Sequence, residues 1–381
     1  MMKQFLIYSG LFCMLNCEAQ AIKLYLLSNH DNAGDHHQCL GVKHALIKLS
    51  HDPISTEDLN TKITPSLQIK NSIEKDLADQ KVIVVGSGEG GIEGIKDLQS
   101  NPSLTTCLLS HMFLEAYQNP SLLEKVNLIA LPTHVSAGLK DKLGSKLIET
   151  TGVAHNRQIE MVDEVYLEWG QKELPACDIY LAVVLGGDAP IPGPSKEMRL
   201  FTEEDATLLA KYVAQDANDA CVLVLNGPRT GKHDADKKEI LTVHRGGYSD
   251  RITELFQKEL AARDVENVKI FDFQHGSQTP YNSFDLALGA VKATRGRIIV
   301  PGDSTSMVSE AIDTLCPGHV LVYESSAMNE VHHAHIASEL AAGRAYVLTN
   351  YNDVSCETKK GEPKPGAATV ISQRLLEAVN D

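Results

Sequence analysis

One turn of the chain carries the residues best suited to bind an anion. The segment PGDSTSMVSEA, residues 301–311, follows an apolar run and leads into a helical pattern. Because the first N–H groups of a helix are unpaired and its dipole is positive there, such a turn can hold a phosphate. Ser304, Thr305 and Ser306 add hydroxyl donors at the same place. The structural alternative is a helix N-cap formed by Thr305 or Ser306.

A second group of residues could carry acid–base chemistry. Asp35, His36 and His37 stand just beyond the first apolar run, and a histidine can accept a proton from a hydroxyl near neutral pH. Gln38 could orient a substrate beside them. Alternatively, Asp35 caps the following helix. His134, at the end of another apolar run, is either a second site residue or a histidine satisfied within the core.

The elements that position these residues alternate along the chain. Short β-branched runs are followed by loops and helical patterns, which predicts parallel sheets covered by helices on both faces. The expected strands are residues 22–27, 81–85 and 126–132, and then 179–187, 221–227, 268–273, 296–302 and 319–324. Two such blocks predict an α/β fold of two Rossmann-like, doubly wound domains with a cleft between them.

The segment Gly86–Gly91 matches the G-x-G-x-x-G pattern of dinucleotide-binding loops. NAD binding would place a pyrophosphate against the following helix and would make the protein an oxidoreductase. However, the preceding strand is not the first of its domain, and no clear acidic residue ends the next strand. We favour the other interpretation, in which this segment is a flexible glycine-rich wall of the cleft.

The segment EVHHAHIASEL raises the question of a metal site, because His332 and His335 share a helix face and Glu330 is near. No further ligands follow at a regular spacing, and the His-Glu-x-x-His pattern of zinc proteases is absent. The sequence therefore predicts no metal site and no tightly bound cofactor.

The overall composition excludes one class of partner. The chain has 381 residues, of which 43% are hydrophobic and 22% charged, as in globular proteins. Its formal net charge of -15 opposes attraction to phosphate backbones, and no run of lysine or arginine overcomes it locally. Nucleic acid is therefore not an expected partner.

Residues 1–21 have the pattern of a secretory signal peptide. Lys3 precedes an apolar stretch, residues 5–15, and Ala-Gln-Ala at 19–21 fits a small-residue cleavage site. The stretch is too short to span a bilayer as a helix. The alternative is a cytoplasmic protein with an apolar extension.

Six cysteines lie beyond residue 21, far apart and without a Cys-x-x-Cys pair, which is typical of buried thiols. If the chain is exported, disulfide bonds between them are also an open alternative.

The order of the motifs resembles one known family. The motifs are NAGDHHQCLGVKHAL (32–46), LPTHV (131–135), GGDAP (186–190), NGPRTG (226–231), TPYNSFDLALGAV (279–291), VPGDSTSMVSEA (300–311) and HIASELAAGRAYVL (335–348). Together they resemble the "elongated mitochondria" family of bacteria and of plant mitochondrial fission, over nearly all of the chain after the leader. Asp35, Val135, Pro228 and Thr279 stand where that family has His, Asp, Arg and Asn.

The resemblance implies the GT-B architecture of glycosyltransferases and nucleotide-sugar epimerases, with a nucleotide-sugar site on the C-terminal domain. The residues that it implies at the phosphates are Ser304, Thr305, Ser306, Arg229 and Thr230. Glu310 would accept hydrogen bonds from the ribose. The arginine and the helix dipole would neutralise the leaving group without a metal. A UDP- or GDP-linked sugar is the expected co-substrate.

The sequence thus predicts a leader at residues 1–21, an acceptor-side domain at 22–174 and a nucleotide-sugar-side domain at 175–381 that ends in a closing helix. The expected function is a metal-independent glycosyltransferase, or a close relative, acting on an unidentified acceptor. One alternative is a non-enzymatic scaffold with a protein partner, since family members are implicated in recruiting dynamin-related proteins. The other is the dinucleotide oxidoreductase. With a cleaved leader the protein is exported, either periplasmic or secreted; otherwise it is cytoplasmic.

Overall fold

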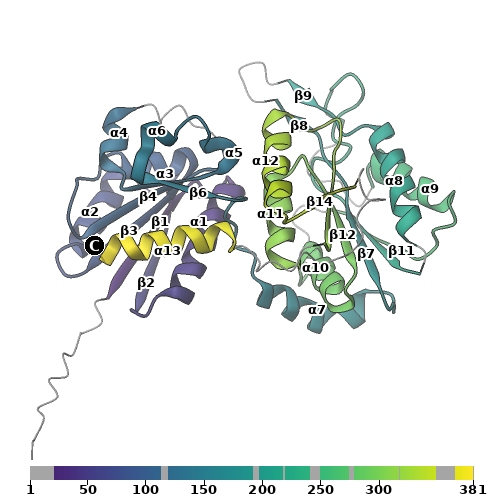
Figure 1. The fold of residues 1–381 in the computed structure, drawn as a ribbon, viewed down its shortest axis with the longest axis horizontal. Helices are drawn as coiled ribbons and strands as arrows, with labels where there is room; N and C mark the ends of the chain where they lie inside the picture. The colour runs from purple at the N-terminus through teal and green to yellow at the C-terminus, as the bar shows by residue number, and fades with distance from the viewer. Residues whose placement is uncertain are drawn as a thin grey trace, which may run out of the picture.

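The computed structural model describes residues 21–112, 119–191, 197–217, 219–240, 249–273, 279–316, 318–348 and 365–380. It contains two α/β domains, each built on a six-stranded parallel sheet (Figure 1). This confirms the predicted fold class. The expected leader lies outside the described residues except for Ala21. No helix in the described part of the chain combines the length and apolar character that a bilayer crossing requires.

The first sheet has the strand order β2-β1-β3-β4-β5-β6. Its strands are β1 (Ile22–Ser28), β2 (Ile54–Asn60), β3 (Lys81–Ser87), β4 (Leu104–Leu109), β5 (Leu128–Pro132) and β6 (Leu147–Thr150). The central strands are apolar on both faces because helices cover the sheet on each side, and residues 82–85 of β3 are fully buried. From β1 the chain adds β2 on one side and then β3 on the other, so the switch in strand order lies between β1 and β3. The carboxyl ends of these two strands therefore flank a position where such sheets bind ligands.

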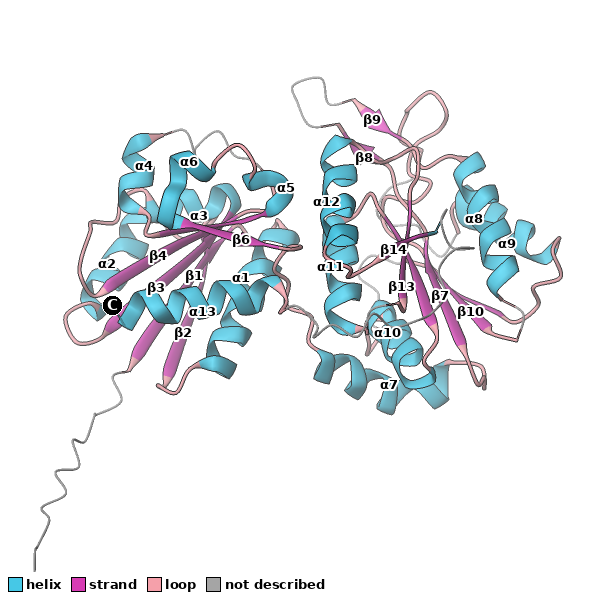
Figure 2. Ribbon diagram, viewed as in Figure 1, coloured by secondary structure: helices cyan, strands magenta, loops and turns pink. Residues whose placement is uncertain are grey.

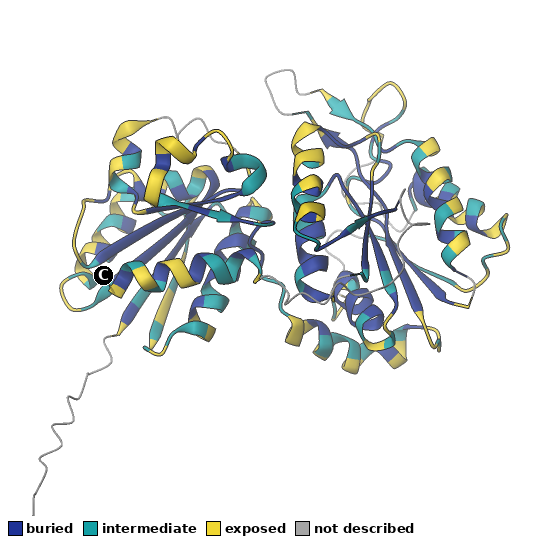
Figure 3. Cartoon of the chain, viewed as in Figure 1, coloured by how far each residue is buried: buried dark blue, intermediate teal, exposed yellow. Residues whose placement is uncertain are grey.

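Helices cover both faces of the first sheet. One face is covered by α1 (Ala33–Leu49) and α13 (Ala367–Asn380), and the other by α2 (Ser66–Asp76), α3 (Gly88–Ile95) and α4 (Pro120–Lys125). The chain after β5 forms α5 (Thr133–Ser136), α6 (Lys140–Leu143) and a 3-10 turn, η2 (Gly144–Lys146). Figure 3 shows the resulting pattern, with buried strands between helices whose outer faces are exposed.

The second sheet has the order β11-β10-β7-β12-β13-β14. Its strands are β7 (Tyr180–Val184), β10 (Cys221–Leu225), β11 (Val268–Phe271), β12 (Arg297–Pro301), β13 (Val320–Tyr323) and β14 (Tyr346–Val347), and a separate pair is formed by β8 (Ala189–Pro190) and β9 (Met198–Arg199). Counted within the domain, this is the dinucleotide-fold order 3-2-1-4-5-6, whose switch point lies between the first and fourth strands. Here these strands are β7 and β12.

Two layers of helices enclose the second sheet (Figure 2). One face carries α7 (Ile159–Glu173), α10 (Ser283–Thr294), α11 (Thr305–Thr314) and α12 (Glu330–Ala341), and the other carries α8 (Glu203–Asp216) and α9 (Arg251–Ala261). The contact between α7 and α10 depends on Gly289, since a Cβ there would lie 2.7 Å from the Val162 carbonyl oxygen. An alanine at this position would push the two helices apart.

Two helices pack on a different domain from the one that the predicted boundaries give them. Although α7 precedes residue 175, its Val162 lies in the core of the second domain. The C-terminal helix α13 returns to the first domain and lies beside α1 (Figure 1), where Ser372 Oγ donates to the Val42 carbonyl (3.1 Å). The observed division therefore differs from a single cut after residue 174. Periodicity shows that a helix has an apolar face, but not which sheet that face covers.

Polar contacts join the two domains. The Arg157 side chain, on the segment after β6, donates to Asp285 of α10 and to Glu310 of α11. A second contact is the hydrogen bond between the Thr133 and Ser338 hydroxyls (2.6 Å), which links α5 to α12. The domain junction thus contains a charged cluster at one place and a helix contact at another.

The described cysteines fall into three groups, one of which is the free and exposed Cys316, contrary to the expected burial. Cys177 and Cys221 form a disulfide between the segment before β7 and the start of β10. Cys39 and Cys107 are buried thiols, as expected for separated cysteines. Burial raises the pKa of Cys107 to about 12, so this thiol stays protonated and unreactive.

Candidate functional site

A cavity of about 870 Å³ opens in the second domain, at the carboxyl ends of its parallel strands. The strand ends that line it are Val184, Leu225, Phe271 and Pro301 of β7, β10, β11 and β12. This edge, at the switch point between β7 and β12, is where open α/β sheets bind ligands. The volume suits a small organic molecule.

Arg229 brings a positive charge to the wall of this cavity. Its side chain is 42% exposed, and its Nη2 lies 3.7 Å from Asp303 Oδ2. Its Nη1 donates to the Asp188 carbonyl (3.4 Å). Gly187 allows the loop that carries Arg229 to pack closely against residue 187, because a Cβ on Gly187 would lie 2.6 Å from Arg229 Cβ. The arginine therefore lies in the loop that follows β10, within the wall of the cavity.

Asp303 is a site residue that the sequence reasoning missed. Burial raises the pKa of this carboxyl to about 6, and the charge of Arg229 opposes the rise. The Gly187 N–H donates to its Oδ2 (3.3 Å), whereas its Oδ1 is buried without a partner among the described residues. A buried acceptor without a partner is costly unless a ligand or water reaches it. The sequence did contain an indication of this role, because Asp303 directly precedes the hydroxyl-rich turn.

The hydroxyl-rich turn forms the start of α11. Ser304 occupies the N-cap position and lines the cavity, and its hydroxyl makes no capping bond to the helix. Thr305 and Ser306 are the first helical residues, so the predicted cap at either of them is wrong. Both are half-buried and neither belongs to the cavity wall. Ser304 and the unpaired N–H groups of α11 are therefore the groups available to an anion here.

Glu310 lies more than one turn into α11 and faces the domain junction. Its buried carboxylate accepts a hydrogen bond from Arg157, which also donates to Asp285. Burial raises the pKa of Glu310, and the charge of Arg157 opposes the rise. The structure thus places the predicted ribose partner outside the wall of the cavity, in an ion pair.

The loop after β10 is shaped by Asn226 and Thr230. The Asn226 amide donates to Asp272 Oδ1 (2.5 Å), which ties the end of β10 to the end of β11. Thr230 Oγ1 accepts from the Gly227 N–H (3.0 Å) and closes the turn that presents the neighbouring arginine. Asn226 was not among the predicted site residues, although it opens the NGPRTG motif. Thr230 therefore has a structural contact besides its predicted role at the phosphates.

Asp35 lies at the switch point of the first sheet. Its buried carboxylate accepts hydrogen bonds from Asn32 Nδ2 (2.6 Å) and Ser87 Oγ (3.3 Å). His111 Nδ1 lies 3.9 Å from it and 3.2 Å from Gln38 Nε2. Asn32, and not Asp35, holds the N-cap position of α1, so the capping alternative for Asp35 is wrong. His111, on the segment after β4, was missed because only the fold brings it here.

The glycines of Gly86–Gly91 are explained by packing. Gly88 has φ +58°, and a Cβ on it would lie 2.2 Å from Asp35 Oδ2. A Cβ on Gly91 would lie 2.4 Å from the Gly86 carbonyl carbon, so these residues let α3 lie against β3. The Asp35 carboxylate occupies the space beside Gly88 and would repel a pyrophosphate. This geometry argues against the NAD hypothesis.

The paired histidines of α1 have different neighbours. His36 Nδ1 lies 3.2 Å from Ser28 Oγ, and its Nε2 lies 3.6 Å from Asp58 Oδ2 of β2. Burial lowers the pKa of His37, and the charges of His36 and Arg157 lower it further. His36 is thus directed to β2, whereas His37 lies within reach of the charge at the domain junction.

His134 lies in α5 and contacts α12 of the second domain. Its ring centroid is 5.0 Å from that of His335, and burial lowers the pKa of His134 to about 4 and that of His335 to about 3. Burial likewise lowers the pKa of His332 to about 4, assisted by the charges of Arg229 and, more weakly, His134. Within the described ranges, His332 and His335 belong to no set of three metal-binding side chains.

Comparisons with known proteins agree with this architecture. No protein-family model and no curated protein sequence matches the chain. The UDP-GlcNAc 2-epimerase from Neisseria meningitidis, solved bound to UDP-GlcNAc, is similar over 94% of this chain and 99% of its own, with a TM-score of 0.54 and 12% identity. The S. aureus MnaA structure with UDP covers 94% and 96% with a TM-score of 0.44 and 12% identity. Acinetobacter baumannii MurG covers 94% and 99% with a TM-score of 0.41 and 10% identity. The epimerase match and the two parallel sheets show a GT-B-like fold.

Proposed function

We propose that this chain binds a UDP- or GDP-linked sugar in the cavity of the second domain, as a glycosyltransferase of GT-B type or a close relative. One observation carries the proposal: the cavity lies at the carboxyl ends of the parallel strands, with Arg229 and the N-terminus of α11 in its wall. The N. meningitidis epimerase, whose fold this chain shares, was solved with UDP-GlcNAc bound.

The diphosphate would lie between Arg229 and the start of α11. The unpaired N–H groups of the helix and the Ser304 hydroxyl would donate to its oxygens. Arg229 is half-exposed and 3.7 Å from Asp303, so its guanidinium can turn to a diphosphate while staying near that carboxylate. A new negative charge beside Asp303 raises its pKa further, so binding is expected to take up a proton.

The rest of the cavity suits a nucleobase. Phe271, Phe273 and Tyr281 also line it, and stacking of a base on an aromatic ring contributes roughly 1–3 kcal/mol. An aromatic wall beside a cation and a helix N-terminus matches a ligand that is flat at one end and anionic at the other. These contacts support a nucleoside diphosphate more than an inorganic anion.

The catalytic group is proposed on the first domain. Asp35, with His111 at 3.9 Å, stands at a sheet edge where ligands bind and has a neighbour for a proton. The ring of His134 lies against His335 and both of its nitrogens are buried, so it could act only after the domains move apart. His37 stays a further candidate. Nucleotide binding by the second domain does not depend on which of these groups is the base.

The order of the sequence motifs supports a place near the "elongated mitochondria" family. A non-catalytic member of that kind would hold a protein partner and would either bind no nucleotide or bind it without turnover. Release of the nucleotide from a UDP- or GDP-linked sugar, or conversion of that sugar to its epimer, therefore distinguishes the enzyme from the scaffold.

Titration calorimetry with UDP, GDP and NAD tests the proposal on the wild type, Arg229→Ala and Arg374→Ala. Arg374 is the matched control, because it is a similarly exposed arginine paired with Glu377 on α13. We expect UDP or GDP to bind and Arg229→Ala to weaken that binding by about 10-fold or more, with no effect of Arg374→Ala. Failure of both nucleotides to bind at millimolar concentration would contradict the proposal and favour the scaffold.

A further inference from the structure

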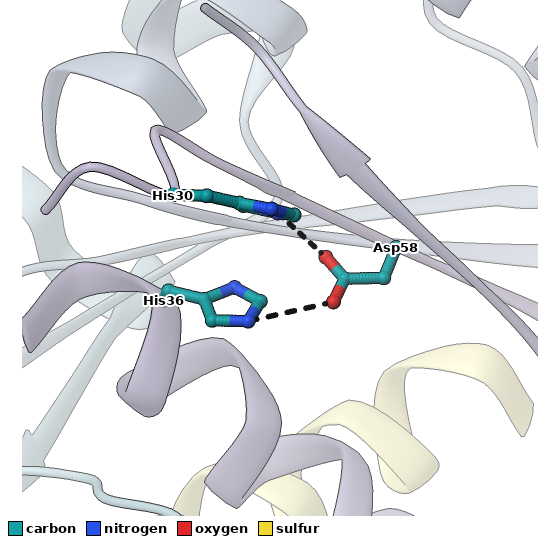
Figure 4. Close-up of side chains that lie close together, drawn as sticks. All are labelled: His30, His36 and Asp58. Carbon is teal, nitrogen blue, oxygen red and sulfur yellow. Dashed lines mark hydrogen bonds and ion pairs between the residues drawn. The ribbon is translucent and has the colours of Figure 1, made fainter. Parts of the chain in front are cut away.

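Three metal-binding side chains converge beside the first sheet (Figure 4). His30 follows β1, His36 lies near the start of α1, and Asp58 belongs to β2. His30 Nε2 lies 3.1 Å from Asp58 Oδ1, and His36 Nε2 lies 3.6 Å from Asp58 Oδ2. In the part of the chain that the structure describes, this is the set of three whose ligand atoms all lie within 4.8 Å of one another.

The register of the sheet fixes this arrangement. Strands β1 and β2 pair in parallel, with Leu26 opposite Asp58, so the carboxylate stands just before the end of β2, next to where β1 turns into α1. The His30 N–H donates to Asn60 Oδ1 (3.3 Å), which holds the loop after β1 against β2. One imidazole comes from that loop, and the other comes from the first turn of α1. Three separate segments thus meet at one carboxylate.

A serine behind His36 sets which ring nitrogen can bind a metal. Ser28 Oγ is 3.2 Å from His36 Nδ1, and Ser28 is fully buried at the end of β1. When Nδ1 donates to this hydroxyl, Nε2 carries the lone pair and points at Asp58. Histidine ligands of metals are commonly oriented in this way, by a hydrogen bond from the nitrogen that does not bind the metal.

The donor set selects a class of ion. Two imidazoles and one carboxylate suit zinc and neighbouring transition metals, whereas calcium and magnesium prefer oxygen ligands alone. Zinc bonds of about 2.0–2.2 Å to N and O place tetrahedral ligand atoms roughly 3.4 Å apart, close to the 3.1 and 3.6 Å between the two Nε2 atoms and the carboxylate oxygens. The side chains of His30, His36 and Asp58 are 31%, 20% and 31% exposed, so solvent can reach a fourth position.

We propose that His30 Nε2, His36 Nε2 and a carboxylate oxygen of Asp58 bind one divalent transition-metal ion of the zinc class, with water as the fourth ligand. The ion replaces the two contacts between the histidines and the carboxylate. It fastens β2 and the loop after β1 to the start of α1, which carries Asp35. The inference rests on the first domain alone and holds whether or not the second domain binds a nucleotide.

Metal binding is measured on the purified full chain, stripped with a chelator, by competition for zinc with a chromophoric chelator and by the visible spectrum after cobalt addition. The variants are His30→Ala and Asp58→Asn. His333→Ala is the matched control, since His333 Nδ1 lies 3.3 Å from Glu324 Oε1 in a histidine–carboxylate pair at the surface. Ser28→Ala tests the hydrogen bond to the ligand His36 without removing a ligand.

We expect one equivalent of zinc to bind the wild type and the His333 variant, and cobalt to give the intense absorption of a four-coordinate site. His30→Ala and Asp58→Asn should lose more than about 100-fold in affinity, and Ser28→Ala about 10- to 100-fold. Zinc should raise the melting temperature of the wild type and of His333→Ala but not of the ligand variants, which checks folding in the same samples. The proposal is overturned if the wild type takes up no zinc at micromolar concentration, or if His333→Ala loses as much affinity as His30→Ala.

Discussion

Replacing Arg157 by methionine is expected to destabilise the fold severely. Its guanidinium donates to both Asp285 and Glu310, and the three side chains are only 12%, 10% and 11% exposed. Methionine keeps most of the volume but leaves two carboxylates facing each other without a cation. Removing one partner of a buried ion pair costs about 3–5 kcal/mol, and the presence of two carboxylates places this site toward the upper end.

The loss of unfolding free energy in Arg157→Met is expected to depend on pH. Burial already raises the pKa of Glu310 in the wild type, and removal of Arg157 raises it further. A carboxyl whose pKa is higher in the folded than in the unfolded state binds more protons when folded, so stability falls as pH rises through that range. The difference between wild type and Arg157→Met should therefore shrink on acidification from about pH 7 to pH 5.

Urea unfolding followed by circular dichroism measures the free energy of unfolding for these variants. Arg374→Ala, which breaks a surface pair, should cost at most about 1 kcal/mol. Adding Glu310→Gln to Arg157→Met should recover part of the loss, because one of the two carboxylates is gone. A loss below about 1 kcal/mol, or a loss that stays constant with pH, would show that Arg157 does not neutralise two buried carboxylates.

Two further predictions concern buried groups. His335 is fully buried, and burial lowers its pKa to about 3. Its charged or titratable neighbours are His134, His332, Arg344 and Glu339. Because the unfolded state takes up the proton at a higher pH than the folded state does, the stability of the fold decreases as the pH falls below the pKa of the unfolded state. Between about pH 7 and pH 5 the wild type should lose roughly 2 kcal/mol that His335→Gln does not lose, as measured by urea unfolding at both pH values. Gly88→Ala should cost about 1–3 kcal/mol, because Gly88 has φ +58° and no room for a Cβ beside Asp35. A melting temperature equal to that of wild type would disprove that second expectation.

The strands were predictable where burial on both faces makes the chain continuously apolar. β3, β10 and β12 are of this kind, and the sequence located each of them. β4 was missed although it is fully buried, because Thr105 and Thr106 interrupt its apolar run, and β6 was missed because its sequence LIET is short and half polar. β2 was not recognised, because it is an edge strand with the polar sequence ISTEDLN and several exposed side chains. Its place beside β1 is set by pairing, which a local pattern does not reveal.

The candidate site was predictable only where one segment carries it. Arg229 and Ser304 follow strands, and parallel strands bring their carboxyl ends to one edge. Glu310 forms an ion pair with Arg157, which is 153 residues away in sequence. No local sequence pattern could therefore show that this carboxylate already has a partner. The same holds for His36 and Asp58, which meet because β2 lies next to β1.

Contact of a diphosphate with Arg229 and the start of α11 can be tested by comparing the binding of UDP and of uridine by calorimetry. The two ligands differ only in the diphosphate, so Arg229→Ala should weaken UDP by about 10- to 100-fold, the equivalent of one or two charge-assisted hydrogen bonds. Uridine, bound by the aromatic wall, should bind the wild type and the variant equally. Equal weakening of both ligands, or an unchanged affinity for UDP, would show that the arginine does not contact the diphosphate and would contradict the account.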